Sequence, residues 1–120
     1  KALLFDDKEI YEQIVNSDSP KEAKKLGRKV SGFDEIVWKE NRKEIVRLGN
    51  IHKFNQNREF GEYLINTKDR ILVEASPVDT IWGIGLDKKS ESAKKPNEWR
   101  GLNLLGFALM EVRDLISQRK

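Results

Sequence analysis

The chain has 120 residues, of which 38% are hydrophobic and 36% are charged, and its formal net charge at pH 7 is +3. This length fits one domain with a single hydrophobic core. Because 23 basic residues are nearly balanced by 20 acidic ones, the charge does not by itself indicate a nucleic-acid-binding protein. The lack of cysteine excludes disulfides and thiolate metal sites. No apolar run is long enough to cross a membrane, so we expect a cytoplasmic protein without a membrane partner.

The first part of the chain predicts two short helices. One of the aspartates at positions 6 and 7 can cap a helix that runs to about Val15, because apolar residues recur on one face of this segment. A second helix start is the run Ser19-Pro20-Lys21-Glu22, which combines a capping residue, a proline in the first turn and a glutamate placed to reach back to the cap. Gly27 is a natural stop, so we predict the second helix over residues 20–26.

A longer helical pattern starts near residue 33. Four residues fall on one stripe when the segment is wound at 100° per residue, and we expect this stripe to face the interior. The stripe consists of Trp38, Ile45, Leu48 and His52. His52 would then be a hydrogen-bonded core histidine or, alternatively, a general base. We expect Gly49 to interrupt this helix and another helix to lie around residues 59–65.

Residues 70–85 form the most informative stretch. Residues 70–73 have the apolar content of a buried strand and turn residues follow, so we predict a short β-strand. A strand does not require Glu74, Asp79 and Trp82, which come at its end. Carboxylates beside an indole could hold a polar ring system, with the indole stacked on its face. Alternatively, the acids brace a loop and the tryptophan belongs to the core, and both interpretations stay open.

The last third of the chain combines a polar loop with a strong helix signal. Residues 87–97 contain no large apolar residue to anchor them, so we expect a mobile surface loop. Apolar residues then keep helical spacing over residues 104–116 and predict the central core helix. Gly106 costs helix stability there, and its expected purpose is to let another backbone approach closely.

The side chains left for chemistry are acids, tryptophans, bases and an amide. They are Glu74, Asp79, Trp38, Trp82, Trp99, Arg28, Lys53 and Asn103. With one histidine, no cysteine and no glycine-rich nucleotide loop, neither a zinc cluster nor a dinucleotide site is indicated, and we expect no metal and no cofactor. The set suits glycosidic cleavage, because a carboxylate stabilises positive charge at an anomeric carbon. An indole would hold the base and a basic residue a phosphate, although each tryptophan, taken singly, also fits a core position.

The order and spacing of several segments resemble the NADAR family, also called YbiA-like, over nearly the whole chain. The segments are residues 1–5, 23–28, 53–54, 72–76, 82–85 and 99–106, together with Trp38 and Asp79. The most specific part of the resemblance is the Leu-Val-Glu-Ala-Ser segment with its Trp-Gly-Ile-Gly sequel, combined with the later Trp-x-Gly-x-Asn-x-Leu-Gly segment.

This resemblance implies an α+β, mainly helical single domain over residues 1–120, with a small β element, that hydrolyses N-glycosidic bonds. It implies nucleotide-like substrates: ribosylamino-pyrimidine phosphates of the riboflavin pathway, or ADP-ribose attached to guanine, including guanine in nucleic acid. Asp79 and Glu74 would be catalytic. The residues expected to bind substrate are Trp38, Trp82, Arg28, Lys53, Asn103 and Gly83, with Arg28 and Lys53 facing phosphate.

One feature of the family is missing from the sequence as it stands. Family members normally carry a stretch with a Glu-His or similar pair, just before the segment that matches residues 1–5, and this stretch supplies a catalytic glutamate. We therefore expect a domain that lacks its N-terminal segment, which a second chain could supply. The alternative is a non-catalytic module that binds ADP-ribose or a related nucleotide, and a further alternative is a plain interaction domain.

Overall fold

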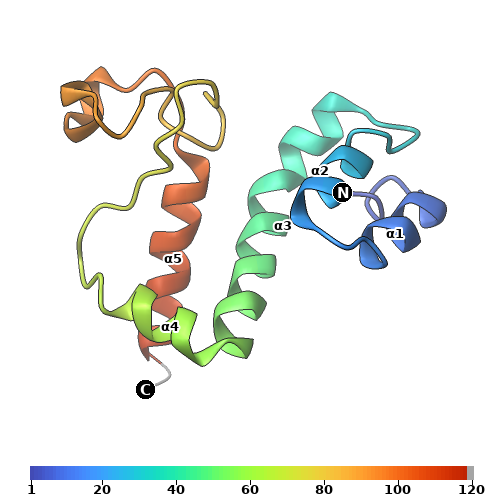
Figure 1. The fold of residues 1–120 in the computed structure, drawn as a ribbon, viewed down its shortest axis with the longest axis horizontal. Helices are drawn as coiled ribbons and strands as arrows, with labels where there is room; N and C mark the ends of the chain where they lie inside the picture. Colours follow the sequence, from blue (N-terminus) through green and yellow to red (C-terminus); the bar gives the residue numbers. More distant parts are fainter. Residues whose placement is uncertain (119–120) are drawn as a thin grey trace. The chain divides into compact units, whose positions relative to one another are not determined.

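The computed structural model describes residues 1–118 and is helical (Figure 1). The chain groups into two compact units, Lys1–Ile45 and Val46–Lys120, and each is described separately here. The single-domain organisation expected from the sequence stays a prediction. The elements are α1 (Lys8–Val15), α2 (Pro20–Gly27), α3 (Glu35–Gln56), α4 (Arg58–Ile65), the 3-10 helices η1 (Glu91–Lys94) and η2 (Pro96–Glu98), and α5 (Leu104–Gln118). None of the helices within the described residues is long and apolar enough to span a bilayer.

Helices α1 and α2 pack against each other in the first unit, and each begins at a predicted capping residue. The Asp7 carboxylate accepts the N–H of Ile10 at 3.1 Å, and Ser19 Oγ accepts the N–H of Glu22 at 3.2 Å. Glu22 Oε2 in turn accepts the N–H of Asp18 at 3.4 Å, one residue before the cap. The prediction of two short capped helices is confirmed.

The segment that follows α2 returns to the start of α1. Asp7 Oδ2 accepts the backbone N–H of Ser31 at 2.8 Å and its hydroxyl at 3.0 Å. The rings of Phe5 and Phe33 meet edge to face with centroids 5.3 Å apart, and the Lys1 ammonium lies 4.6 Å from the Phe33 ring centre. A single aspartate therefore both caps α1 and closes the loop that leads to α3.

Helix α3 is continuous, so the expected interruption at Gly49 is wrong. The side-chain amide of Asn50 donates to the carbonyl of Val46 at 2.8 Å, within the helix. Leu48 is 45% exposed and His52 is also exposed, so neither faces an interior. Helical periodicity identifies which residues share a face but not whether another element covers that face. The interpretation of His52 as a core histidine is therefore wrong.

The core of the second unit lies where α4 packs on α5. Leu64, Val112 and Ile116 are buried there. Partly buried apolar residues surround them: Ile51, Phe54, Ile65, Leu72 and Leu109. Buried residues of α5 recur at positions 108, 112 and 116, which is one face of a helix. The predicted core helix is confirmed for this unit.

Residues 70–74 are extended but form no β-strand, and no strand occurs within residues 1–118. The predicted α+β class with a small β element is therefore wrong, and the described fold is helical. A strand needs a neighbouring strand to bond its backbone. Side chains of Asn103 and Arg113 bond the backbone of this segment instead.

The polar segment before α5 has more structure than its composition predicts. It contains η1 and η2, and the indole N–H of Trp99 donates to the carbonyl of Ala93 at 2.9 Å. The tryptophan that follows the segment therefore anchors it, and the expected mobility of residues 87–97 stays a prediction. Trp99 also lies 6.5 Å from Phe107, centroid to centroid, which gives this tryptophan a structural role.

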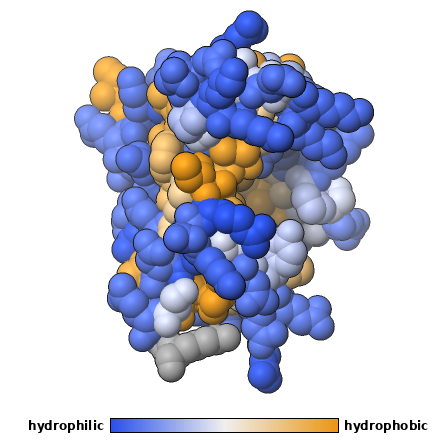
Figure 2. Space-filling model, turned by 90° about the vertical axis from the view of Figure 1, so that its left-hand side faces the viewer, coloured by the Kyte–Doolittle hydropathy of each residue, from blue (hydrophilic) through white to orange (hydrophobic). Residues whose placement is uncertain are grey.

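Large apolar side chains of the second unit remain exposed around the extended segment and the start of α5. They include Ile71, Val73, Val78, Leu102 and Phe107. Figure 2 shows hydrophobic surface framed by hydrophilic residues on the side of the molecule that it presents.

Candidate active site

The Asp79 carboxylate is held in a fixed orientation by the turn that it begins. Its Oδ1 accepts the N–H of Ile81 at 3.0 Å and the N–H of Trp82 at 2.8 Å. The N–H of Asp79 itself donates to Ser76 Oγ at 3.1 Å. Aspartates commonly bond backbone N–H groups two and three residues ahead, and this local pattern forms the turn. It leaves Oδ2 without a hydrogen bond in the part of the chain that the structure describes.

Gly83 is the point where the backbones of the two candidate acids meet. A Cβ atom built on Gly83 would lie 2.8 Å from the carbonyl oxygen of Glu74 and 2.9 Å from that of Asp79. The same two carbonyl oxygens accept hydrogen bonds from the residues after Gly83. The N–H of Ile84 donates to Glu74 at 3.0 Å, and the N–H of Gly85 donates to Asp79 at 3.1 Å. Only glycine fits this junction without moving its neighbours. We call residues 74–83 the acid loop.

Asn103 fastens the acid loop from the start of α5. Its Oδ1 accepts the N–H of Glu74 and its Nδ2 donates to the carbonyl of Leu72, both at 3.0 Å. Its backbone N–H donates to Gly83 at 2.9 Å, and the residue is fully buried with a left-handed φ of 52°. Asparagine tolerates this conformation better than most residues. The Asn103 side chain, for which the resemblance implies a binding role, therefore holds the acid loop in this structure.

Two glycines allow this close packing, and neither can be replaced without displacing a neighbour. A Cβ on Gly106 would overlap the carbonyl oxygen of Leu72 and the side-chain amide of Asn103. A Cβ on Gly101 would overlap the carbonyl oxygen of Gly83. The prediction that Gly106 admits another backbone is confirmed.

The remaining predicted site residues lie elsewhere. Lys53 is exposed on α3, with its ammonium 5.5 Å from the Phe54 ring and 5.7 Å from the Phe60 ring. Arg28 and Trp38 belong to the first unit, where Arg28 is exposed at the end of α2 and Trp38 is half-buried. The roles expected for these three residues stay predictions.

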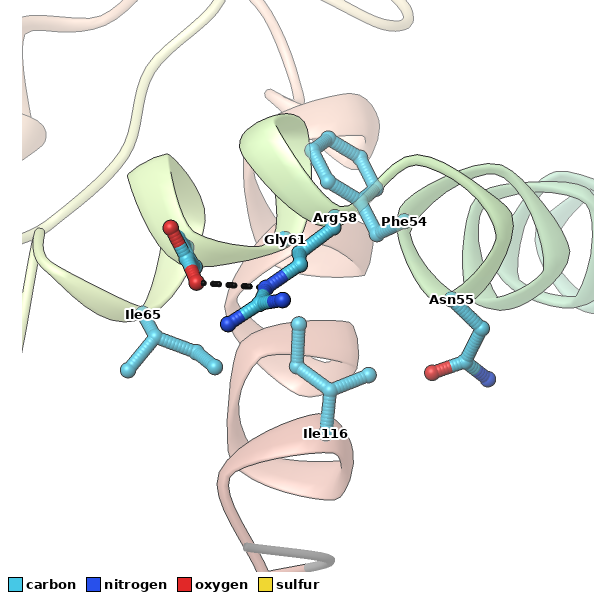
Figure 3. Close-up of a pocket in the computed structure, with 7 residues that line it drawn as sticks. Phe54, Asn55, Arg58, Gly61, Ile65 and Ile116 are labelled. Atoms are coloured by element: carbon cyan, nitrogen blue, oxygen red, sulfur yellow. Dashed lines mark hydrogen bonds and ion pairs between the residues drawn. The ribbon is translucent and has the colours of Figure 1, made fainter.

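The junction of α3, α4 and α5 encloses a cavity of about 390 Å³ (Figure 3). Phe54, Asn55, Gly61, Ile65 and Ile116 line it, together with an ion pair. In that pair Arg58 Nε lies 3.1 Å from Glu62 Oε1, and a dashed line marks the pair at Arg58 in Figure 3. The Arg58 side chain is almost fully exposed, so this pair contributes little to stability.

A second cavity, of about 490 Å³, lies in the polar segment between the acid loop and α5. Four lysines line it with Ser90 and Glu91: Lys88, Lys89, Lys94 and Lys95. This group was not predicted from the sequence, although two Lys-Lys pairs lie close together there. Concentrated ammonium groups suit a phosphate-bearing ligand.

The acid loop, its asparagine tie and its glycine contacts coincide with the most specific part of the sequence resemblance. The profile of the NADAR domain matches residues 1–117. The chain belongs to the NADAR domain family. Its sequence similarity to individual proteins supports the same assignment.

Three relatives show how far this NADAR domain extends in other proteins. N-glycosidase R617 of Acanthamoeba polyphaga mimivirus is 40% identical over 114 residues, which cover 95% of this chain and 67% of that protein. Protein irg-1 of Caenorhabditis elegans is 41% identical over 122 residues, which cover 100% of this chain and 58% of that protein. The chloroplastic riboflavin biosynthesis protein PYRR of Zea mays is 33% identical over 113 residues, which cover 91% of this chain and 16% of that protein. The chain thus spans about 58 to 67% of the first two relatives and a small part of the third. The first of these relatives is named an N-glycosidase, which agrees with the reaction class that the resemblance implies.

Proposed function

We propose that this NADAR domain hydrolyses an N-glycosidic bond between ribose and a base nitrogen. The observation that carries the proposal is the Asp79 carboxylate, which the backbone N–H groups of Ile81 and Trp82 hold in the same loop as Glu74. Membership of a family with a relative named N-glycosidase supports the same reaction class.

Asp79 is proposed to stabilise the positive charge that develops on the sugar. Its Oδ1 accepts two backbone N–H groups, and its Oδ2 makes no hydrogen bond within residues 1–118. A carboxylate that is already oriented does not need to reorganise as the oxocarbenium-like transition state forms. Leaving one oxygen unbonded preserves its capacity to interact with the substrate.

Trp82 and Glu74 are proposed to supply the other two functions. The half-buried indole of Trp82 would stack on the leaving base. Glu74 is half-buried, and its carboxylate has no hydrogen bond or ion pair among the described residues. It would position the attacking water or transfer a proton to or from the base. Asn103 and Gly83 would act indirectly. They hold the backbone of the acid loop and so fix the positions of Glu74 and Asp79.

The substrate class is a phosphorylated N-riboside. One relative is named a riboflavin biosynthesis protein, which favours a ribosylamino-pyrimidine phosphate. The four lysines of the 490 Å³ cavity favour a ligand with one or more phosphates, and ADP-ribose attached to guanine also meets that description. Because ammonium groups bind phosphate as point charges, this feature selects for charge and not for one particular base.

Base release separates hydrolysis from simple binding. The chain is incubated with a ribosylamino-pyrimidine phosphate and, separately, with ADP-ribosylated guanosine, and the free base is quantified by chromatography. Calorimetric titration with ADP-ribose is run on the same preparation. Release of base above the uncatalysed rate supports the proposal. Binding without release would instead support a nucleotide-binding module, and the absence of both would overturn either ligand-based function.

A further inference from the structure

The extended segment at residues 70–74 has one bonded edge and one open edge. In an extended chain the N–H and C=O groups of a residue point to one side, and those of the next residue point to the other. Leu72 and Glu74 point towards Asn103, which bonds both. Ile71 and Val73 must point away, and no hydrogen bond within residues 1–118 involves their backbone groups. The segment therefore presents the unpaired edge of a strand.

The side chains at this open edge are apolar and exposed. Ile71 is 63% exposed and Val73 is 39% exposed. Both are β-branched, which favours a paired strand. An exposed apolar edge with unpaired backbone groups is the feature that pairs with another extended chain. The hydrophobic surface in Figure 2 belongs to the side of the molecule on which this part of the chain runs.

The residues that flank the edge carry opposite charges, and neither forms an ion pair within residues 1–118. Arg70 donates to the carbonyls of Thr67 and Asn66 but forms no ion pair within the described chain. The Glu74 carboxylate has no such partner either. Four residues of extended chain separate Arg70 from Glu74 by about 13 Å, at about 3.3 Å per residue, so the two cannot pair with each other.

We propose that a second copy of the chain pairs with this edge in an antiparallel arrangement about a two-fold axis at Leu72. In this register Ile71 lies opposite Val73 of the partner subunit, and the two residues exchange both backbone hydrogen bonds. By symmetry, Val73 lies opposite Ile71 of the partner subunit and exchanges the same two backbone hydrogen bonds. Arg70 then lies opposite Glu74 of the partner subunit on each side of the axis. A two-fold axis requires a self-complementary surface, and the order Arg-Ile-Leu-Val-Glu provides one.

This register explains why a second copy fits the edge better than an unrelated strand. Directly opposed β-branched residues and opposite charges both stabilise antiparallel pairs. A shift by one residue would move the apolar side chains to the wrong face and place Arg70 opposite an apolar residue. Pairing also places the partner's Arg70 beside Glu74, so that each copy contributes a cation next to the acid loop of the other.

The self-association is measured by sedimentation velocity over a series of concentrations that reaches hundreds of micromolar. Wild-type chain is expected to show a monomer–dimer equilibrium. Val73→Pro removes an N–H from the open edge while remaining compatible with an extended backbone, and it is expected to abolish the dimer. Val73→Ala keeps that N–H and serves as the matched control, which is expected to weaken dimerisation without abolishing it. Circular dichroism checks that each variant keeps its helices.

Charge reversal tests the register. Arg70→Glu and Glu74→Arg each place like charges opposite each other and are expected to weaken the dimer by about tenfold or more, while the double variant restores it. Restoration cannot come from a purely structural role of either residue. A wild-type chain that stays monomeric throughout the series would overturn the proposal. So would a dimer that Val73→Pro leaves intact, or a double variant that fails to recover association.

Discussion

The side chain of Asn103 bonds Glu74 and takes the place of a neighbouring β-strand. Its Oδ1 lies 3.0 Å from the Glu74 nitrogen, and its Nδ2 lies 3.0 Å from the Leu72 oxygen. One buried amide therefore satisfies both the acceptor and the donor of one edge of the extended chain. The position of a candidate catalytic acid depends on this contact.

Asn103→Asp is expected to destabilise the second unit. The new carboxylate can still accept the Glu74 N–H, but it cannot donate to Leu72, and it places a charge against a carbonyl oxygen. Leaving a buried acceptor without a donor costs about 2 kcal/mol, and the buried charge adds to that. Urea denaturation measures the loss of unfolding free energy. Asn97→Asp, at an exposed position of η2, is the matched control and should change stability little.

Gly106→Ala and Gly49→Ala should have opposite effects on stability. A Cβ on Gly106 would overlap Leu72 and Asn103, and overpacking of this kind costs about 1 to 3 kcal/mol. Gly49 lies within α3 with nothing within 4 Å of its built Cβ, so alanine there should stabilise by about 0.5 to 1 kcal/mol. Thermal unfolding of both variants gives the comparison. Equal stability of the Gly106 variant and wild type would contradict close packing of Gly106 against Leu72 and Asn103.

Removing Lys88 and Lys89 should weaken binding of phosphorylated ligands. The double alanine variant is expected to raise the Kd for ADP-ribose by about threefold to tenfold, since each exposed ion pair contributes up to about 1 kcal/mol. The effect should shrink at high salt because exposed charges are screened. A double alanine variant at Lys24 and Lys25 removes the same charge from α2 and is the control. If both double variants bind equally well, the lysine cavity does not hold phosphate.

The contribution of Asp7 to stability should depend on pH. The N–H of Ser31 and then that of Ile10 donate to its carboxylate, and these bonds hold the pKa of Asp7 below its ordinary value of 3.8. Since the folded pKa is the lower one, the stabilisation is complete above 3.8 and is lost as the pH falls through the folded pKa.

Comparison of wild type with Asp7→Asn isolates this pH dependence. The variant should be less stable at neutral pH, and the difference should disappear in acid, where both side chains are neutral. Urea denaturation at several pH values measures it. Asp6→Asn changes a neighbouring carboxylate that makes no hydrogen bond within residues 1–118 and should show no comparable trend. A difference that persists in strong acid would mean that charge is not the cause.

Local signals in the sequence predicted the elements that depend on local contacts. Ser19 and Asp7 cap helices through bonds to residues three positions ahead, and the α5 face at Val112 follows from helical spacing alone. The role of Gly106 was predictable because a glycine inside a helix lowers its stability and usually occurs where another part of the chain packs closely. These features require no knowledge of distant parts of the chain.

Features that depend on distant residues were not predictable in the same way. The extended segment at residues 70–74 has the composition of a strand, but whether it pairs depends on Asn103, 29 positions after Glu74 in sequence. His52 has the spacing of a core residue but lies on an exposed face. Similarly, Trp99 orders a polar segment through a bond to Ala93 that composition does not reveal. The candidate site itself was found through the residue types of the acid loop, and its Asp79 turn explains why they occur together.

The most direct test of the proposed hydrolase is the rate of base release by Asp79→Asn under single-turnover conditions. The asparagine carbonyl can still accept the N–H groups of Ile81 and Trp82, so the acid loop and the unfolding transition should be unchanged. We expect the rate of base release to fall by about a hundredfold or more, because a preorganised charge is lost from the transition state. Release at the wild-type rate by a folded variant would contradict the central role of this carboxylate.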